Sequence, residues 1–364
     1  MIKNLFSKLF DFLTNQLTDK QIKITSLVLV AVTVLAGGGY WVITTWFQPL
    51  GPSLSLSTPT VEVLSQGTLS PGSTAVPGET LTPTIEPVCG APPTMNIIVA
   101  GVASQNYIYG LADAVRLVRF DFQTQTVSVL ALPRDLWVEI PGIEDHGITV
   151  GKLNQAYFYG TQGMGYYEGS GYGSGLLAYT LQENYGVWTD HYLAVNLESF
   201  VQIIDRIGGI DIYLAGDVYR KVNGEPEVFL KAGSRHLNGK KAEIMARQRI
   251  EIGDFGRINN QTVILKGIAA KMLTPSGLQA IPDLVNQLKR NVLTDLSPNQ
   301  ISQLICLAGK IDYQQDVFFV TLPEALMNQT MVYDPVRNIN TSALVGDTAG
   351  IRSLIEDFQA GIWP

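Results

Sequence analysis

The chain has 364 residues, of which 46% are hydrophobic and 16% charged, and its formal net charge is −7. This length allows one large domain or two small ones with a real core. An acidic chain without a basic tract is poorly suited to nucleic acid, because neutralising phosphates supplies most of that affinity, so we expect no nucleic-acid partner. Three histidines and two cysteines, well apart in the sequence, form no zinc-type cluster.

The N-terminal region contains a long apolar run. Residues 24–47 include no charged residue, and about 20 apolar residues are enough to cross the hydrocarbon core of a membrane. Tyr40, Trp41 and Trp46 suit the outer interface. A cleaved signal peptide is the alternative, but the run is too long and no small-residue cleavage site follows it closely. The sequence therefore predicts one transmembrane helix over 24–47.

The basic residues set the expected orientation. Lys3, Lys8, Lys20 and Lys23 precede the span, and the next Lys or Arg is Arg116. The positive-inside rule places residues 1–23 in the cytoplasm and the rest of the chain outside. Apolar residues in 1–23 recur at helical spacing, which fits either a helix on the inner membrane face or an extension of the span.

A segment rich in Pro, Ser and Thr follows the span. Residues 48–92 contain no Lys or Arg, and such a segment buries too little apolar surface to offset its ordering entropy. We predict an extracytoplasmic linker of extended character. Cys89 lies near its end, and outside the cell it could pair with Cys306. Two unpaired thiols are the alternative.

Residues 93–364 alternate strand and helix patterns. Apolar runs and alternation predict strands over 95–102, 114–121, 127–132, 136–140, 191–195, 210–214 and 317–321. Helical periodicity and stop signals predict helices over 176–185, 198–207, 240–246 (with Asn238 as a cap), 258–273, 298–308 and 349–360. The expected fold is an α/β sandwich with a mixed sheet flanked by helices. The Gly- and Tyr-rich residues 160–175 are expected to form a mobile loop, whose tyrosines either stack on sugar rings or simply face solvent.

Leu132-Pro133-Arg134-Asp135 stands at the end of a predicted strand. Loops after strand ends are where α/β proteins place ligands, and Pro fixes the backbone from which Arg134 projects. An ordinary turn with a local Arg–Asp pair is the alternative.

Residues 246–261, ARQRIEIGDFGRINNQ, concentrate charge in a sparsely charged chain. Arg247 and Arg249 would point the same way on an extended segment, whereas Arg257 and Gln261 would share a helix face. Glycines on either side of Asp254 allow a tight bend between the two pieces. The stretch predicts either a salt-bridged surface or a site for an anion such as pyrophosphate, because guanidinium groups match phosphate oxygens bidentately.

Two enzyme classes are excluded by missing motifs. Asp254-Phe255-Gly256 spells a kinase motif, but no strand lysine of the VAIK type and no HRD loop precede it. No G-x-S-x-G is present, so a serine hydrolase of that type is also excluded.

The outer region resembles the LytR-CpsA-Psr (LCP) family of bacterial cell-envelope proteins over about residues 95–275. The resemblance rests on an ordered set of runs: MNIIVAGV, LADAVRLVRFD, VSVLALPRDLWVEIPG, GKLNQAYFYG, VNLESFVQIIDRIGGIDIYL, LKAGSRHLNGKKAEIMARQR and GDFGRINNQ. The predicted short cytoplasmic segment, single span and outer domain match the family as well.

The resemblance implies a membrane-anchored phosphotransferase that holds a polyprenyl-pyrophosphate-linked glycopolymer and transfers its glycan-phosphate to peptidoglycan or another envelope glycan. The lipid tail would lie in an apolar groove. By motif, the pyrophosphate would contact Arg134, Arg247, Arg249 and Arg257, supported by Gln261. Asp113 matches the family's metal-side aspartate and would hold Mg²⁺, and Asp254 matches an acid near the arginines. The residues carried over as catalytic are Asp113, Arg134, Arg247, Arg249 and Asp254. Lys152 and Asn154 match a Lys-Ile-Asn run and are expected to be structural.

Four positions depart from the family pattern: Ala103, Gln105, Leu111 and Asn260 stand where an acid or arginines are usual. Losing a carboxylate should weaken a magnesium site, which relies on few protein ligands. Arg116 and Arg119 on the neighbouring strand are candidates to replace a lost arginine, although alternation puts Arg116 on the face opposite Arg119 and Asp113.

Two functions therefore remain open. One is the phosphotransferase, and the other is a non-catalytic binder of lipid-linked or wall glycans that has lost part of the machinery. A transcriptional regulator is disfavoured by the expected outside location and the acidic charge.

Overall fold

The computed structural model describes residues 44–54, 56, 85–250, 253–288 and 291–363. The predicted span over 24–47 lies almost wholly outside these residues, as do residues 1–23 and most of the linker. Within the described part, no helix is long and apolar enough to cross a membrane. The described residues divide into two compact units, 44–48 with 297–299 and the remainder. The second unit carries the fold described below.

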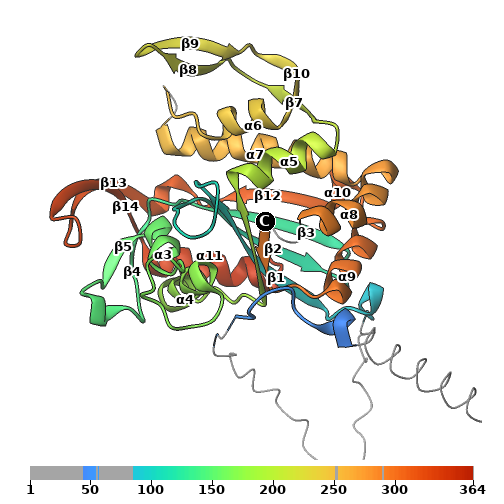
Figure 1. Ribbon diagram of the computed structural model, residues 1–364, viewed down its shortest axis with the longest axis horizontal. Helices are drawn as coiled ribbons and strands as arrows, with labels where there is room; N and C mark the ends of the chain where they lie inside the picture. Colours follow the sequence, from blue (N-terminus) through green and yellow to red (C-terminus); the bar gives the residue numbers. More distant parts are fainter. Residues whose placement is uncertain (1–43, 55, 57–84, 251–252, 289–290, 364) are drawn as a thin grey trace, which may run out of the picture. The chain divides into compact units, whose positions relative to one another are not determined.

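A six-stranded mixed sheet forms the centre of this unit (Figure 1). Its order is β11-β6-β1-β2-β3-β12. The strands are β1 (Thr94–Val102), β2 (Ala112–Asp121), β3 (Thr126–Leu132), β6 (His191–Asn196), β11 (Val292–Thr294) and β12 (Val317–Thr321). β1, β2 and β3 form an antiparallel meander, whereas β6 and β12 run parallel to their neighbours β1 and β3. The predicted mixed α/β architecture is confirmed.

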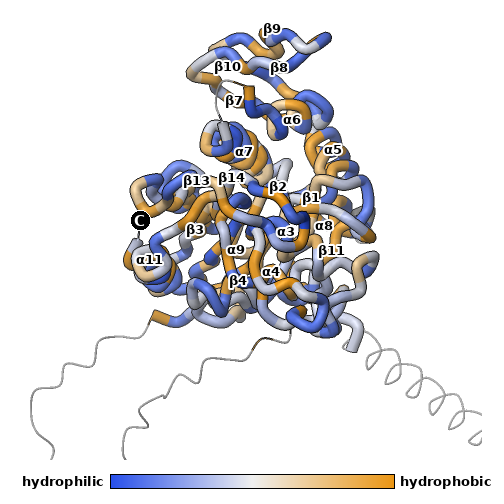
Figure 2. Tube along the Cα trace, turned by 90° about the vertical axis from the view of Figure 1, so that its left-hand side faces the viewer, coloured by the Kyte–Doolittle hydropathy of each residue, from blue (hydrophilic) through white to orange (hydrophobic). Residues whose placement is uncertain are grey.

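The two faces of the sheet carry different side chains because alternate residues of a strand point to opposite sides. On one face, Val115, Leu117 and Leu130 join the largest hydrophobic core, which packs against α3 (Leu153–Tyr159), α4 (Tyr172–Tyr185) and α11 (Thr348–Ala360). On the other face, Arg116, Val118 and Val129 meet α7 (Gly253–Met272) and α9 (Pro298–Ala308). In the side view of Figure 2, β2 lies between α4 and α7.

A smaller core forms around α7. It joins α5 (Leu197–Arg206) and α6 (Gly239–Ala246) to the two-stranded sheet of β7 (Ile210–Leu214) and β10 (Gly233–Leu237). The hairpin β8 (Val218–Val222) and β9 (Glu225–Leu230) extends from this part (Figure 1). Two further helices are α8 (Pro275–Leu288) and α10 (Tyr313–Asp316).

Two further small sheets border the site. β4 (Trp137–Glu139) pairs with β5 (Val150–Lys152), and β13 (Met327–Asp334) pairs with β14 (Ile339–Gly346). The backbone amide of Leu344 on β14 donates to the carbonyl oxygen of Asp135 at 2.9 Å. The β13–β14 hairpin is therefore attached directly behind the Pro133-Arg134-Asp135 turn.

Cys89 and Cys306 form a disulfide that joins residues 217 apart in sequence. It connects the short 3-10 helix η1 (Val88–Gly90) to α9. A small core that includes Met95, Phe122 and Leu307 surrounds this connection.

Several elements differ from the sequence-based prediction. α7 begins at Gly253 instead of 258, because Asp254 to Gly256 already belong to the helix. α8 begins at Pro275, where no helix was predicted: Pro is compatible with the first helical turn, since its missing amide has no partner there. α4 begins at Tyr172, so the predicted loop 160–175 is shorter. The strands β8 to β10 and β13–β14 were not predicted.

Candidate functional site

Arg134 lies at the centre of the site, directly after β3. Its side chain is buried with 8% exposed. Nη1 donates to Oδ1 of Asp113, and Nε lies 3.7 Å from Oδ2 of Asp135 and 3.6 Å from Oδ1 of Asp254. One guanidinium therefore meets three carboxylates from three segments: the start of β2, the turn after β3, and α7.

Arg257 is the most buried charge of the group, with 2% of its side chain exposed. It pairs with Asp254 one helical turn earlier on α7. Among the described residues, its Nε and Nη1 find no hydrogen-bond acceptor, whereas Nη2 is held by the ion pair with Oδ1 of Asp254. Burial and the nearby charge of Arg134 lower the pKa of Arg257. Buried cationic donors without acceptors are costly, and an anion would satisfy them.

Arg116 joins this group from the face of β2 that meets α7. Its Nη2 donates to Oε1 of Gln261 at 3.1 Å. Gln261 in turn donates to the carbonyl oxygens of Asp113 and Ala246, both at 3.3 Å. Burial, together with the charge of Arg257, lowers the pKa of Arg116 to about 10, so the side chain stays protonated at neutral pH. We call Arg116, Arg257 and Arg134 the arginine row.

Two carboxylates lie against each other beside the row. Burial raises the pKa of Asp254, and the neighbouring charge of Asp135 adds to the rise against the opposing effect of Arg257. Oδ1 of Asp135 also lies 3.2 Å from Nζ of Lys152. Asp254 can therefore accept a proton more readily than an isolated aspartate.

The structure separates the two arginines that the sequence predicted to act as a pair. Arg249 lines the pocket, whereas Arg247 does not. α6 runs to Ala246, and Arg247 keeps a helical backbone at its C-cap. Its Nη1 therefore reaches back one turn to Oε1 of Glu243 at 2.9 Å. The expectation of an extended Arg247/Arg249 pair on one side of the chain is wrong.

The predicted bend around Asp254 is also displaced. Gly253 has a positive φ of 63° and Gly256 lies inside α7. Asp254, Arg257 and Gln261 consequently lie on the same helix. Their spacing of three and four residues places them on one face, which directs all three toward β2 and the turn after β3.

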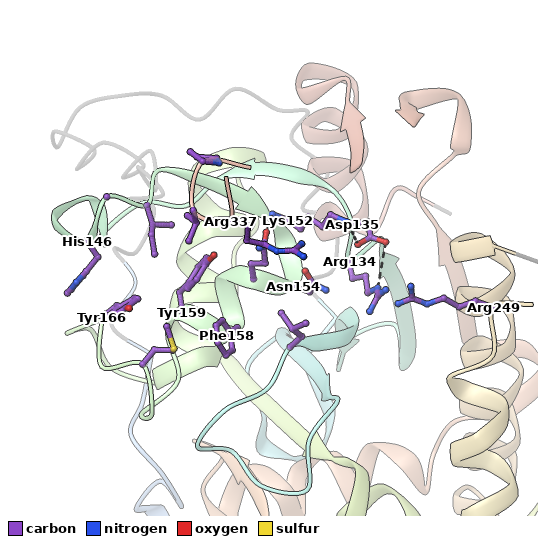
Figure 3. A pocket seen from close by; sticks show the side chains of 17 residues that line it. Arg134, Asp135, His146, Lys152, Asn154, Phe158, Tyr159, Tyr166, Arg249 and Arg337 are labelled. Atoms are coloured by element: carbon purple, nitrogen blue, oxygen red, sulfur yellow. Dashed lines mark hydrogen bonds and ion pairs between the residues drawn. The ribbon is translucent and has the colours of Figure 1, made fainter. Parts of the chain in front are cut away.

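A cavity of about 870 Å³ opens beside Arg134. At one end, Arg249 projects toward Arg134 from the opposite wall, with Lys152 and Asn154 nearby (Figure 3). His146, Tyr166, Tyr159 and Phe158 lie toward the other end. The α3 segment that bears several of these residues is held next to the arginine, since the amide of Asn154 donates to the Arg134 carbonyl at 3.0 Å.

A second cavity, of about 280 Å³, lies between the sheet and helices α7 and α9. Its lining is apolar except for one residue, Arg116. Val118, Phe120 and Val129 form its floor, and Leu265 and Ala269 of α7 are among the residues that cover it. We call it the apolar cavity. Arg116 connects it to the arginine row.

Of the positions that depart from the family pattern, Leu111 and Ala103 lie beside this site. Leu111 lines the first cavity and is 36% exposed. The amide of Ala103 donates to the carbonyl of Leu111 at 2.9 Å, so the two positions are adjacent. Gln105 uses its carbonyl to accept from Asn196. Nδ2 of Asn260 is buried and has no acceptor among the described residues.

Arg116 and Arg119, the two candidates for replacing a lost arginine, lie on opposite faces of β2, as strand alternation predicts. Arg116 belongs to the arginine row. Arg119, on the other face of β2, pairs with Asp121 at 2.8 Å and donates to the carbonyl of Gln359 on α11. Arg119 therefore has a structural role.

Several site residues were missed or assigned a structural role from the sequence. Lys152 and Asn154 line the cavity instead of serving only the fold. Asp135 was named only as part of the turn Leu132-Pro133-Arg134-Asp135, without a role of its own. Phe158, Tyr159, His146 and Arg337 were not singled out. They come from segments that the tertiary fold alone brings together.

The structure offers limited support for a bound metal ion. Among the described residues, no group of three or more His, Cys, Asp or Glu side chains is arranged to hold one. Asp113 binds Arg134 through Oδ1 and is 28% exposed. Any divalent ion here would take most of its ligands from water or a bound phosphate, which is common for Mg²⁺.

Comparison with known proteins gives consistent matches. The model of the LytR_cpsA_psr family matches residues 83–344. Regulatory protein MsrR of Staphylococcus aureus is 27% identical over 268 residues, covering 72% of this chain and 74% of MsrR. The Bacillus subtilis protein named polyisoprenyl-teichoic acid–peptidoglycan teichoic acid transferase TagV is 29% identical over 191 residues, covering 51% of this chain and 45% of TagV.

Solved structures share the fold. The crystal structure of B. subtilis TagV aligns with a TM-score of 0.57 at 23% identity, covering 74% of this chain and 98% of that one. A structure described as TagT bound to LIIa-WTA aligns with a TM-score of 0.54 at 18% identity, covering 74% of this chain and 91% of that one.

Proposed function

The chain belongs to the LytR_cpsA_psr family, and from that membership and the geometry of the site we propose that it is a membrane-anchored phosphotransferase. Its donor is a polyprenyl-pyrophosphate-linked glycopolymer, and its acceptor is a hydroxyl group of peptidoglycan or another envelope glycan. The relative TagV, named as a teichoic acid transferase that links polyisoprenyl-bound polymer to peptidoglycan, supports this class of reaction.

The proposal rests on one observation: the two ends of the arginine row line two different cavities. Arg116 is the single charged residue lining the apolar cavity. Arg134 lines the larger cavity of about 870 Å³, which we call the open cavity. On α7, Arg257 stands between Asp254, which contacts Arg134, and Gln261, which contacts Arg116. A molecule with a lipid at one end, a pyrophosphate in the middle and a glycan at the other matches this order.

The apolar cavity would hold the part of the lipid next to the pyrophosphate. Burial of apolar surface drives its binding. The pyrophosphate would then satisfy the unpaired donors of Arg257 and the Nε of Arg134, with Arg249 closing from the opposite wall. Guanidinium groups suit this task because they contact phosphate oxygens bidentately.

The transfer step follows from this placement. The acceptor hydroxyl oxygen attacks the phosphorus that carries the glycan, and the bond from that phosphorus to the bridging oxygen breaks. Polyprenyl phosphate leaves, and the hydroxyl proton passes to the carboxylate pair of Asp135 and Asp254, of which Asp135 lines the open cavity. The arginines stabilise the negative charge that develops on the phosphate oxygens.

We extend the proposal to Mg²⁺ at Asp113. This carboxylate is partly exposed beside Arg134, and the ion would add neutralising charge at the pyrophosphate. With few protein ligands available, its binding should depend on the donor. Omitting Mg²⁺ should therefore weaken donor binding without lowering the melting temperature of the free protein.

The proposed location is a cell membrane, with residues 1–23 inside and the domain from about residue 93 outside. The charge-free run over 24–47 and the lysines before it support this arrangement. A protease added to intact cells should digest the outer domain, and protection of that domain would contradict the orientation.

The direct test uses the outer domain with a polyprenyl-pyrophosphate-linked oligosaccharide, a glycan acceptor and Mg²⁺. We expect polyprenyl phosphate and a new phosphodiester to appear together. Neither product forming, although the donor binds, would overturn the enzymatic proposal.

That outcome defines the second candidate, a binder of lipid-linked or wall glycans without turnover. Leu111 favours it, because an apolar side chain faces the cavity where the family usually has an arginine. Under this alternative, Leu111→Arg together with Ala103→Asp should produce turnover that the natural chain lacks.

A further inference from the structure

The start of the linker lies against the domain. The backbone amide of Leu50 donates to the carbonyl oxygen of Leu296 at 3.2 Å. Further along, the amide of Leu54 donates to Oδ2 of Asp295 at 3.3 Å. We call residues 49–54 and 56 the strap. Two hydrogen bonds therefore connect the strap to the short segment between β11 and α9.

Asp295 gives the strap a buried acceptor. This residue is 1% exposed, and its Oδ1 accepts the amide of Tyr192 on β6 at 2.9 Å. One carboxylate therefore holds both the beginning of β6 and the amide of Leu54. Buried polar atoms in proteins are almost always hydrogen-bonded, so release of the strap would deprive Oδ2 of a donor.

Side-chain packing adds to these hydrogen bonds. Leu54 and Leu56 are half-buried and pack against the largest hydrophobic core. A Cβ at Gly171, which precedes α4, would stand 3.0 Å from Cδ2 of Leu54. A Cβ at Gly51 would stand 2.7 Å from the carbonyl oxygen of Thr294. The strap approaches the domain this closely because both positions lack a side chain.

Two prolines restrict the strap before it docks. Pro49 and Pro52 alternate with the residues that contact the domain. Each proline ring fixes φ near −65°, which reduces the conformational entropy that the free segment would lose on docking. The strap is therefore suited to stay bound to the domain.

The strap shortens the reach of the linker. From residue 47, where the predicted span ends, to residue 85, a fully extended chain would reach about 130 Å. From residue 47 to Leu50 it reaches only about 10 Å. Because Leu50 is hydrogen-bonded to Leu296, the shorter of these two distances limits how far this edge of the domain can move from the span.

The segment that holds the strap leads directly into a wall of the apolar cavity. α9 follows this segment in the chain, and Leu304 and Leu307 of α9 line the cavity. A short tether at this point would keep the apolar cavity near the bilayer in which a lipid-linked donor resides.

We propose that the strap attaches the outer domain to the foot of the membrane span and holds the β11 edge of the sheet next to the membrane surface. The inference rests on the proposed function, since it takes the predicted span as the anchor. It goes beyond that function by assigning the side of the domain that faces lipid. The length of the chain between residues 56 and 85 then has no influence on the height of the domain above the membrane.

The test inserts the same Gly-Ser segment of about ten residues on either side of the strap. One insertion lies between residues 48 and 49, and the other between residues 70 and 71. The full chain is reconstituted in vesicles of phosphatidylcholine and phosphatidylglycerol. Energy transfer from a fluorophore on a C-terminal tag to acceptor lipids reports the height of the domain. The first insertion should raise the domain by about 15–20 Å, the mean extension of such a segment, and the second should leave the height unchanged.

A pair of double variants tests the docking itself. Leu54→Asp with Leu56→Asp places two charges against the hydrophobic core and should release the strap. Pro52→Asp with Ser53→Asp is the matched control, because both positions are exposed on the same segment. Amide hydrogen exchange over residues 49–56 should be slowed about tenfold or more in the wild type and the control. The leucine variant should lose this protection.

Equal effects of the two insertions would overturn the strap, because the whole linker would then set the height. No effect of either insertion would overturn it as well, since another surface would then hold the domain on the lipid. Unprotected amides over residues 49–56 in the wild type lead to the same conclusion. Absence of energy transfer in every protein contradicts the proposed membrane location, and with it the proposed function, whereas hydrogen exchange still decides whether the strap is docked.

Discussion

Nη2 of Arg116 donates to Oε1 of Gln261 at 3.1 Å, and this contact joins β2 to α7 at the boundary between the apolar cavity and the arginine row. Gln261 is neutral and makes three contacts in the site, so it orients Arg116 without neutralising it. The positive charge of Arg116 thus remains available to a ligand. An acid at this position would form a closed ion pair and weaken anion binding.

Arg249 and Arg247 provide a matched pair of substitutions two residues apart. Arg249→Ala should lower the affinity for pyrophosphate about tenfold, the effect of losing one charge-assisted contact. Arg247→Ala should leave that affinity unchanged, because Arg247 pairs with Glu243 outside the cavity. Calorimetric titration with inorganic pyrophosphate measures both. Equal losses in the two variants would contradict the separation of their roles.

Pyrophosphate should stabilise the folded protein. At about 100 times its Kd, binding to the folded state alone contributes roughly 2.7 kcal/mol, which corresponds to a rise in Tm on the order of 5–10 °C. Arg257→Gln should remove most of this rise, because Arg257 carries unpaired buried donors. Arg235→Gln on β10, at a half-buried position that lines neither cavity, is the control. Thermal unfolding with and without pyrophosphate measures the rise in Tm for each protein. A rise in Arg257→Gln as large as in the wild type would contradict the role of Arg257.

Stability should fall with rising pH through the titration of Asp254. Its folded-state pKa is raised, chiefly by burial, so the folded protein binds the proton more tightly than the unfolded chain. The free energy of unfolding therefore decreases as pH rises from the ordinary aspartate pKa of about 3.9 to the raised folded value.

Asp254→Asn should flatten the stability profile in that pH window, as followed by urea unfolding at a series of pH values. Asp283→Asn, an exposed position on α8, serves as the control. Since Asp254 belongs to the proposed proton acceptor, the acid limb of transfer activity should report its titration. A profile for Asp254→Asn identical to the wild type would show that the carboxylate is not perturbed.

Filling the apolar cavity should separate lipid from phosphate recognition. Ala269→Phe places a ring in this cavity from α7. Affinity for farnesyl pyrophosphate should fall toward that for inorganic pyrophosphate, and the latter should not change. Ala360→Phe at the exposed end of α11 is the comparison. Undiminished binding of the farnesyl compound would place the lipid elsewhere.

The disulfide should contribute to stability independently of ligand binding. Replacing Cys89 and Cys306 together by serine removes a link across 217 residues and should lower the free energy of unfolding by about 2–4 kcal/mol. Reduced wild-type protein should match the variant in urea unfolding. Oxidised and reduced forms of equal stability would argue that the bond adds nothing.

Much of the fold follows from local sequence. The strands over 95–102, 114–121 and 127–132 were predicted because their apolar runs and the turn between the last two are local signals. Asn238 was predicted to cap a helix, and its side chain accepts the amide of Lys241. Elements that depend on distant partners were missed. β13 and β14, for example, are largely exposed strands without a clear alternation of burial.

For the site, the sequence determined the set of charged residues and the family that carries them. Motifs are contiguous, so Arg134, Asp254, Arg257 and Gln261 can be identified from the order of residues alone. Only the tertiary structure decided which of these charges share a pocket. Arg247 and Arg249 are two residues apart, but only Arg249 lines the cavity, because Arg247 lies at the end of α6. Arg116 and Arg257 are distant in sequence and belong to one site because β2 packs against α7.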